Sequence, residues 1–497
     1  MRKHIPIELV EMESKIKKST RGTIAAIVEK SNEVKPVQET PSTTDILRQL
    51  VNQFNPLDFE ALANPGKKED FKLHTKHFLI LSIENALKFA EKNNWGLCKN
   101  NDFIYLYNGT FWAELDKETF QKFLGAAAEK MGVPKFSARY YQFREQLFKQ
   151  FLSTAYLPTP VIDKNKVLIN LQNGTFEISS HGTKLRPFDR KDFITYQLPF
   201  EYNPGAKAPI FQAYLNKVLP DVESQRVLAE YLGYVFIKHG SKALKEEKAL
   251  ILFGGGSNGK GVFFEVVNAL LGAENISSYS LQSITDDSGY FRAKLANKLV
   301  NYASEISGKL ESSRFKQMVS GETVDARLPY GQPFNMEQYA KFIFNCNKLP
   351  TDVEHTHAYF RRFLIIPFGV TISESEKNTN LHNEIIDAEL SGVFNWVLDG
   401  LKRLLTQKRF SECKAAEKAV EEYKVDSDSV QTFLMEHGYK PSHIMSTALK
   451  VMYPEYVTYC KDSNFKPVSI RSIRDRITSC GVIVERKTQG FEVFAVK

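Results

Sequence analysis

The stretch ALILFGGGSNGKGVFFEVVNALLG, residues 249–272, decides the fold because a glycine-rich loop joins two apolar elements in it. The apolar run Ala249 to Phe253 predicts a buried strand, and VFFEVVNALL predicts an apolar helix. Between them Gly254, Gly259 and Lys260 complete the pattern G-x-x-x-x-G-K. Backbone N–H groups and the helix N-terminus bind phosphates in such loops, and the lysine reaches the β and γ phosphates. The stretch therefore predicts a nucleotide-binding α/β core.

All candidate nucleotide-binding residues lie in this loop: Gly254, Gly256, Ser257, Asn258, Gly259, Lys260 and Gly261. The same glycines also satisfy G-x-G-x-x-G, the fingerprint of dinucleotide-binding folds. The lysine, and the lack of a convincing following βαβ unit with a ribose-binding acid, weigh against that interpretation. The favoured interpretation is a phosphate loop of an NTPase, and a dinucleotide site or an ordinary turn are the alternatives.

Gly261 stands where such loops usually carry the Ser or Thr hydroxyl that binds Mg²⁺. Because Mg²⁺ keeps several waters and binds few protein groups, a water can fill this position. The run Leu299 to Ala303 predicts a neighbouring strand, and Glu305 follows its end. We expect Glu305 to polarise the attacking water or to hold Mg²⁺ through waters; the alternative is a solvated turn residue. ATP and Mg²⁺ are the expected cofactors.

The composition fits a large protein with a polyanionic partner. The 497 residues suggest about three domains. Lys and Arg number 66 against 58 Asp and Glu, and the resulting net charge of +8 suits a polyanion without requiring one. Five cysteines without a C-x-x-C pair argue against a zinc ribbon and a disulfide scaffold. We find neither a signal peptide nor an apolar window of about 18 residues, so we expect a cytoplasmic protein without a membrane partner.

Patterns outside the loop divide the chain into further units. FIYLYNGTFWAEL and VLINLQNGTFEIS place Asn-Gly between apolar runs and predict β-hairpins rather than glycosylation sites. A helical pattern broken near Pro220 predicts two helices before the loop, and LHNEIIDAELSGVFNWVLDGLKRLLTQ predicts an amphipathic helix after it. The predicted units are a mobile arm that can carry a short helix at either end (1–58), a mixed α/β domain (59–200), a helical connector (201–245), an ATPase domain (246–370), a helical segment (371–427) and a C-terminal domain (428–497).

The C-terminal domain has the pattern of a winged helix. Ser469 is a candidate N-cap, and Ile470, Ile473 and Ile477 share one face of the helix that follows. Two strands joined by KTQG come next, and a helix followed by a basic hairpin is the winged-helix order. Such domains bind DNA or dock proteins, and both possibilities stay open. The candidate DNA contacts in this domain are Arg471, Arg474 and Lys487.

From Phe315 to Phe368 the chain reads FKQMVSGETVDARLPYGQPFNMEQYAKFIFNCNKLPTDVEHTHAYFRRFLIIPF. This stretch resembles the superfamily 3 helicases of the poxvirus and phage/plasmid primase-helicase branch, where K-x-x-x-S-G-E, A-R, N-x-L-P and R-R-F precede an apolar I-P-F. The resemblance extends upstream through YNGTFWAEL, INLQNGTFEI and EYLGY, and covers about 60–370. The fold class it implies is α/β, with an AAA+-like P-loop ATPase core behind a mixed α/β N-terminal domain.

The resemblance implies catalytic roles for five residues: Lys260, Glu305, Asn347, Arg361 and Arg362. Asn347 matches the polar sensor that orients water; the alternative is an asparagine that merely ends a strand. Arg361 and Arg362 resemble the arginine finger, which in a ring stabilises the transition state at the neighbouring subunit's ATP. We prefer Arg362 because it directly precedes the apolar strand FLIIPF, and a surface pair of arginines opposite acids is the alternative.

The sequence departs from the family at Gly261 and at the predicted pore hairpin, where Gly331 rather than a basic residue follows Tyr330. Candidate DNA contacts in this region are Lys316, Arg327 and Tyr330, with salt bridges and hairpin packing as the alternative. His355 and His357 form an H-x-H without further ligands at fixed spacing, so we expect no metal there. We find no primase chemistry either, which indicates the helicase portion without a primase domain.

The sequence therefore predicts an ATP-dependent DNA helicase that forms a homo-oligomeric ring, with a hexamer expected. It would act on single-stranded and forked DNA during replication of a phage or mobile element, in the cytoplasm of a bacterial host and alongside a separate primase or polymerase. The alternative is an ATP-binding origin-recognition or loading scaffold with little hydrolysis, because Gly261 leaves the metal without its usual hydroxyl ligand.

Overall fold

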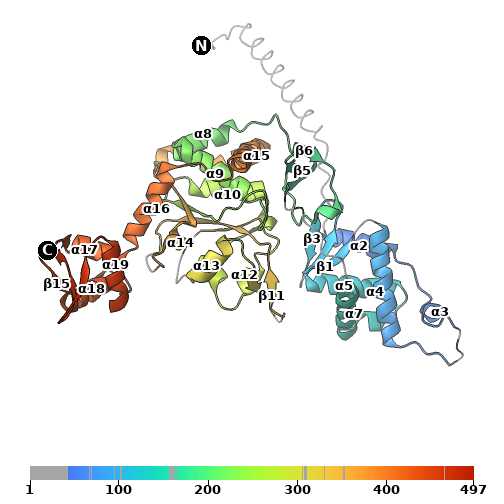
Figure 1. Ribbon diagram of the computed structural model, residues 1–497. Helices are drawn as coiled ribbons and strands as arrows, with labels where there is room; N and C mark the ends of the chain where they lie inside the picture. Colours follow the sequence, from blue (N-terminus) through green and yellow to red (C-terminus); the bar gives the residue numbers. More distant parts are fainter. Residues whose placement is uncertain are drawn as a thin grey trace, which may run out of the picture.

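The computed structural model describes residues 43–66, 68, 70–93, 96–100, 103–155, 163, 165–304, 306, 311–329, 331–350, 353–463 and 465–497. Figure 1 shows an N-terminal region in blue, a central region in green, yellow and orange, and a C-terminal region in red. None of the helices in the described ranges is long and apolar enough to span a membrane.

The central region is built on a sheet of five parallel strands in the order β13-β7-β12-β9-β8. The strands are β7 (Ala249–Phe253), β8 (Ile276–Ser277), β9 (Val300–Ala303), β12 (Lys341–Cys346) and β13 (Phe363–Pro367). Both faces of the sheet are covered, which explains why the strands are nearly continuous apolar runs. The predicted α/β class and the predicted strands before the glycine loop, before Glu305, before Asn347 and after Arg362 are confirmed.

Four helices cover one face of this sheet: α8 (Pro209–Val218), α9 (Val222–Tyr234), α10 (Lys260–Leu271) and α15 (Leu381–Gln407). Leu250 and Leu252 of β7 pack against them. The helices α9 and α15 approach closely through glycines, since a Cβ at Gly233 would lie 2.6 Å from the Cβ of Leu401, and one at Gly400 would meet the backbone of Ala229. The predicted helices on either side of the loop are confirmed, including the break near Pro220.

Shorter elements cover the other face, where Ile251, Phe344 and Ile365 point. They are α11 (Leu281–Thr285), α12 (Tyr290–Ala293), α13 (Ser312–Val319), the hairpin of β10 (Val324–Ala326) and β11 (Phe334–Met336), α14 (His357–Phe360) and α16 (Lys414–Asp426). The β10–β11 hairpin corresponds to the predicted pore hairpin, whose candidate DNA contacts include Arg327. Because α16 contributes Tyr423 to this core and α15 covers the opposite face, the predicted helical segment 371–427 packs as part of the central region.

The N-terminal region is a mixed α/β unit with its own core. Its elements are α2 (Thr43–Gln53), α3 (Phe59–Ala63), α4 (Thr75–Lys92), β1 (Leu97–Asn100), β2 (Phe103–Tyr107), β3 (Trp112–Leu115), α5 (Lys117–Lys130), α6 (Lys135–Arg139) and α7 (Tyr141–Thr154). The first predicted Asn-Gly hairpin is confirmed as β2 and β3. The arm predicted over 1–58 is too long, because Ile46, Leu47 and Leu50 of α2 are buried in this core. Residues 1–42 lie outside the described residues.

The second predicted hairpin is confirmed as β4 (Val167–Leu171) and β5 (Gly174–Ser179), to which β6 (Gly182–Arg186) is added. This small sheet does not share the N-terminal core. Its residues Ile169 and Phe176 pack instead in the core of α8, α9 and α15. The predicted unit 59–200 is therefore divided among three cores, because Phe103 and Trp112 of β2 and β3 pack in the core on the other face of the parallel sheet. The connector 201–245 belongs to the central region, because the apolar faces of α8 and α9 are buried there.

The C-terminal region has a separate core. It contains α17 (Ser429–Glu436), β14 (Lys440–Pro441), β15 (Thr447–Ala448), α18 (Leu449–Asp462), α19 (Ile470–Ser479), β16 (Val484–Lys487), β17 (Gly490–Val493) and β18 (Ala495–Val496). Ser469 caps α19 as predicted, since its side chain accepts a hydrogen bond from Ser472 N. Ile473 and Ile477 are buried, but Ile470 is exposed, so the predicted apolar face is one residue shorter.

Candidate functional site

The glycine loop joins the carboxyl end of β7 to the first turn of α10, and its backbone demands glycine at several positions. Gly256 and Gly259 have φ of 106° and 86°, values that favour glycine, and Ser257 has a φ of 46°. Gly254 has no room for a side chain, because a Cβ there would meet Asn258 Nδ2 and the backbone oxygen of Phe368. These positions explain why a glycine-rich sequence is needed between this strand and this helix.

Side chains and backbone from neighbouring elements hold the loop in place. Asn258 Nδ2 donates to Phe368 O at 3.1 Å, and the backbone N–H of Ile372 donates to Ser257 O at 2.7 Å. The hydroxyl of Tyr214, on α8, donates to Gly259 O at 2.8 Å. No sequence motif marks Tyr214, which lies 45 residues before Gly259 on an ordinary amphipathic helix. The loop is thus anchored by α8 and by the chain after β13.

Lys260 is the first residue of α10 and is buried. Its Nζ donates to Gly254 O at 2.5 Å and to Asn347 Oδ1 at 3.2 Å. Burial lowers the pKa of this ammonium group from its ordinary value, an effect that Cys346 partly offsets. Asn347 directly follows β12, the strand beside β7, so two residues 87 positions apart meet at the carboxyl end of the sheet. The structure thus brings together the two residues that the sequence assigned as lysine and sensor.

The remaining predicted residues of this edge are Gly261 and Glu305. A Cβ at Gly261 would meet nothing within 4 Å, so the space beside the helix start is open. Glu305 lies outside the described residues. The preceding strand β9 ends at Ala303, which pairs with Phe344 of β12. The end of β9 is therefore at the same edge of the sheet as the loop.

Arg361 and Arg362 precede β13 and lie at the opposite, amino end of the sheet. The side chain of Arg362 is 9% exposed; its Nη2 donates to Ser320 Oγ at 2.7 Å and its Nε to Lys316 O at 3.2 Å. The side chain of Arg361 is 46% exposed and pairs with Glu247 at 2.6 Å. The preference for Arg362 as the finger stays a prediction, and Arg361 is the more accessible of the two.

The predicted DNA contacts of the central region lie on its lower face in Figure 1, around α13 and the β10–β11 hairpin. Lys316 forms a salt bridge with Glu354 at 2.7 Å. Arg327 is exposed, and its Nε donates to Gly331 O at 3.0 Å. Tyr330 lies outside the described residues. His355 Nε2 contacts Ser427 O at 2.8 Å, which joins His355 to the chain before α17.

In the C-terminal region, the predicted contacts lie on α19 and on the following hairpin. Arg471 and Lys487 are exposed, and the ammonium of Lys487 lies 4.8 Å from the ring centre of Phe494. Arg474 stacks over Phe491 of the hairpin at 4.1 Å. Arg474 thus packs α19 against the hairpin, whereas Arg471 and Lys487 leave their charges at the surface.

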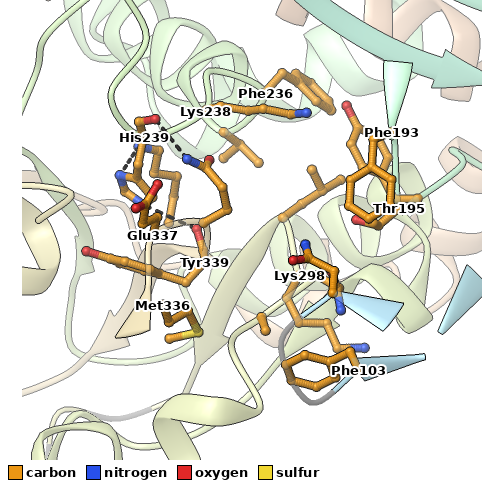
Figure 2. A pocket seen from close by; sticks show the side chains of 18 of the residues that line it. Phe103, Phe193, Thr195, Phe236, Lys238, His239, Lys298, Met336, Glu337 and Tyr339 are labelled. Carbon is orange, nitrogen blue, oxygen red and sulfur yellow. Dashed lines mark hydrogen bonds between the residues drawn. The ribbon is translucent and has the colours of Figure 1, made fainter. Parts of the chain in front are cut away.

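A cavity of about 340 Å³ lies at the amino end of the sheet, between the N-terminal and central regions. Figure 2 shows His239 and Tyr339 on one side of it and Phe193 and Thr195 on the other. Lys341, the first residue of β12, is buried here, and its Nζ donates to Tyr234 Oη at 3.2 Å and to His239 Nδ1 at 3.0 Å. His239 Nε2 in turn donates to Tyr339 O at 3.1 Å. The sequence predicted neither the cavity nor this network.

Two family matches cover the chain in part. Residues 86–220 match a family described as "D5 N terminal like", and residues 252–362, which include the whole glycine loop, Asn347 and both arginines, match a "Family of unknown function (DUF5906)". The first match begins in α4 of the N-terminal region and ends after α8.

The curated relatives are viral. Over 253 residues, or 49% of this chain, the sequence is 24% identical to "Putative helicase L207/L206" of Acanthamoeba polyphaga mimivirus. Over 325 residues, or 59% of this chain, it is 24% identical to "Putative primase C962R" of African swine fever virus. The chain spans only 26% and 32% of the lengths of these two relatives.

Among solved structures, the apo NrS-1 C-terminal region aligns with 82% of this chain and 97% of its own length, at 14% identity and a TM-score of 0.45. The family match over residues 86–220 and the viral relatives together support a relationship to D5-like primase-helicase proteins.

Proposed function

We propose that this chain is an ATP-dependent DNA helicase of superfamily 3 that assembles into a ring, with a hexamer expected, and acts in replication of a phage, virus or other mobile element. The observation that carries this proposal is the glycine loop, which holds the buried Lys260 against Asn347 at the carboxyl end of a parallel sheet. The viral relatives, whose names are those of a helicase and a primase, support a replication-associated role in DNA processing.

The loop residues fit the phosphates of ATP. The first turn of α10 has no acidic residue, so its free N–H groups and the positive end of the helix dipole are unopposed. The ammonium of Lys260 adds a positive charge, and its two hydrogen-bond acceptors are neutral oxygens. Negatively charged phosphate oxygens would bind this ammonium more strongly than these neutral oxygens do. The position of this loop after β7, next to the central strand β12, supports the proposal of an AAA+-like P-loop core.

Magnesium would be held by Glu305 and by waters, because Gly261 offers it no ligand atom. When bound with ATP, the ion would neutralise part of the charge on the phosphates. The open space at Gly261 leaves room for a water in place of the usual hydroxyl.

The arginine pair supports action between subunits rather than within one. Arg361 and Arg362 precede β13, while the glycine loop follows the neighbouring strand β7, and parallel strands place these two features at opposite ends of the sheet. Neither arginine is therefore beside the loop of its own chain. A ring in which the amino end of one sheet faces the carboxyl end of the next would bring them together, and the exposed Arg361 is then the finger that we favour.

Single-stranded and forked DNA are the proposed partners. The exposed Arg327 on the β10–β11 hairpin, together with Tyr330, would contact a strand in the pore of the ring. In the C-terminal region, α19 followed by the β16–β17 hairpin supports the proposal of a winged helix, in which the exposed Arg471 and Lys487 would contact phosphates. A primase or polymerase would be supplied by another chain or domain.

Steady-state ATP turnover with and without single-stranded DNA, measured together with unwinding of a forked duplex, tests this proposal. A helicase shows turnover that rises with DNA, and ATP-dependent strand separation. Tight ATP binding with negligible turnover under both conditions would instead support the alternative, an ATP-binding origin-recognition or loading scaffold, for which Gly261 is the argument.

A further inference from the structure

Three aromatic side chains lie exposed where α6 meets α7 in the N-terminal region. Phe136, Tyr140 and Tyr141 are 89%, 50% and 66% exposed. The rings of Tyr140 and Tyr141 meet edge to face, with centroids 5.0 Å apart, and Gln142 Nε2 donates to Tyr141 Oη at 3.1 Å. We call these three residues the aromatic surface. Large apolar rings that cluster outside a core usually mark a binding site.

The fold itself explains why these rings point outward. Ala138 of α6 and Phe143 and Leu147 of α7 are buried in the N-terminal core and fix the inner face of both helices. Tyr140 is extended, with φ of −70° and ψ of 133°, and joins the two helices at a corner. The aromatic surface occupies the outer side of this corner, so its residues contribute little to the core that holds the helices.

The segment that carries the aromatic surface is basic. The segment 130–144, KMGVPKFSARYYQFR, carries four basic residues and no acidic one. Among the described residues, the exposed Lys130 and Lys135 form no salt bridge, whereas Arg139 is held by Glu129 through two hydrogen bonds of 2.9 Å. Arg144 is half-buried, and its Nε has no hydrogen-bond partner within the part of the chain that the structure describes. The segment therefore presents cations that the protein itself only partly neutralises.

Exposed aromatic rings among unpaired cations suit single-stranded DNA. Unpaired bases stack on aromatic side chains, while lysines and arginines contact the phosphates between them. A duplex would satisfy only the cations, because its bases are already stacked within the helix. A second copy of this chain would bring the same positive charges face to face and would repel it.

We propose that the aromatic surface, with Lys130 and Lys135, binds single-stranded DNA outside the pore of the ring. This inference rests on the proposed function, because it adds a second contact for the same DNA. The site would hold a strand that enters or leaves the ring.

The experiment measures binding of a short fluorescein-labelled oligothymidylate to the full chain by anisotropy, for the wild type, Phe136→Ala/Tyr141→Ala and Phe136→Tyr/Tyr141→Phe. The alanine pair removes two stacking platforms and should weaken binding roughly tenfold or more, while the aromatic pair should bind within about twofold of the wild type. Leu62→Ala, which truncates another exposed apolar residue of this region, is the matched control and should bind normally.

A charge variant tests the phosphate contacts separately. Lys135→Gln should weaken binding and lower the slope of log affinity against log salt by about one. Thermal unfolding should be unchanged in all variants, since the substituted side chains are exposed.

The outcomes separate this inference from the proposed function. A wild type that binds no single-stranded DNA would overturn both. A wild type that binds DNA with an unaltered affinity in the alanine pair would overturn this inference alone. An alanine pair with normal DNA affinity and altered ring assembly, measured by light scattering, would show that the aromatic surface contacts a neighbouring subunit instead.

Discussion

The two ends of the parallel sheet each carry a buried lysine, in very different surroundings. Lys260 lies at the carboxyl end and Lys341 at the amino end, and burial lowers the pKa of both. Lys341 donates to Tyr234 Oη and His239 Nδ1, and its ammonium lies 4.3 Å from the ring centre of Tyr234. Lys260 instead donates to a backbone oxygen of the glycine loop and to the Asn347 amide.

The comparison teaches that burial of a charge does not by itself indicate a ligand site. The partners of Lys341 are themselves held in place: His239 Nε2 donates to Tyr339 O, and a Cβ at Gly321 would meet His239 Nδ1. Lys260 lies beside a helix start and a loop with positive φ angles, which offer N–H groups to an anion. We therefore interpret Lys341 as a structural lysine that joins elements, and Lys260 as the lysine of the proposed phosphate site.

The largest expected effect tests this distinction directly. Lys260→Ala should abolish ATP turnover, because the phosphates lose the one cation that the loop supplies. Lys341→Met, the matched control, should keep turnover within about threefold of the wild type, since its network lies at the other end of the sheet. Steady-state phosphate release from both purified variants provides the measurement.

Circular dichroism would establish that both variants are folded before turnover is compared. Normal turnover in Lys260→Ala would refute the phosphate-loop assignment. Complete loss of ATP turnover in a folded Lys341→Met would show that the two ends of β12 are coupled, and that Lys341 also affects the nucleotide site.

The arginine pair extends the comparison to the proposed contact between subunits. Arg361→Ala should bind ATP nearly normally and lose roughly 10³-fold in turnover, the scale of arginine fingers. Arg362→Ala should mainly lower thermal stability, because its guanidinium donates both to the end of α13 and to Ala358 O of α14 within one chain. Turnover, nucleotide affinity and unfolding temperature of the two variants decide between them.

A mixing experiment then asks whether the finger acts in trans. Rings mixed from Arg361→Ala and Glu305→Gln subunits contain some interfaces with both groups intact, so mixing should restore part of the turnover. Full activity of Arg361→Ala alone, together with loss in a folded Arg362→Ala, would return the role to Arg362, as the sequence first suggested.

The glycine loop offers a smaller effect with a steric cause. Gly254→Ala should weaken nucleotide binding by roughly tenfold or more, because its methyl group would displace Asn258 and the backbone at Phe368.

Gly261→Ser should leave turnover intact or lower the magnesium concentration needed, since the site is open and the hydroxyl becomes a possible ligand. Titrations of ATP and of Mg²⁺ measure the two effects. Loss of activity in a folded Gly261→Ser would instead mean that this glycine is required.

Local patterns predicted the carboxyl end of the sheet well and the amino end poorly. The strand, glycine loop and helix are contiguous, and Asn347, which the family resemblance implied, follows an apolar run that agrees with a strand. The Lys341 network joins residues more than 100 positions apart, and no spacing rule links them. For the same reason the sequence placed β4 and β5 in the wrong unit: their alternation predicts a hairpin, but not that the hairpin packs near α15. Which core receives an apolar face is decided by tertiary packing.

The smallest effect concerns the pH dependence of stability at the amino end. Burial lowers the pKa of Lys341 from 10.5 to about 7, so above pH 7 the unfolded chain binds this proton and the folded chain increasingly does not. Stability should therefore rise as pH increases from 7 towards 10.5, because the unfolded state binds more protons in that window.

Other groups also titrate in this range, among them Lys238, whose pKa burial lowers to about 8, so the wild type alone is not informative. The difference between the wild type and Lys341→Met isolates the one ammonium group. In urea unfolding, the wild type should gain on the order of 1–2 kcal/mol over the variant between pH 7 and pH 9. The contact with the ring of Tyr234 opposes this gain, because it favours the charged form. A difference between wild type and variant that stays constant over this range would mean that the ring keeps Lys341 protonated in spite of its burial.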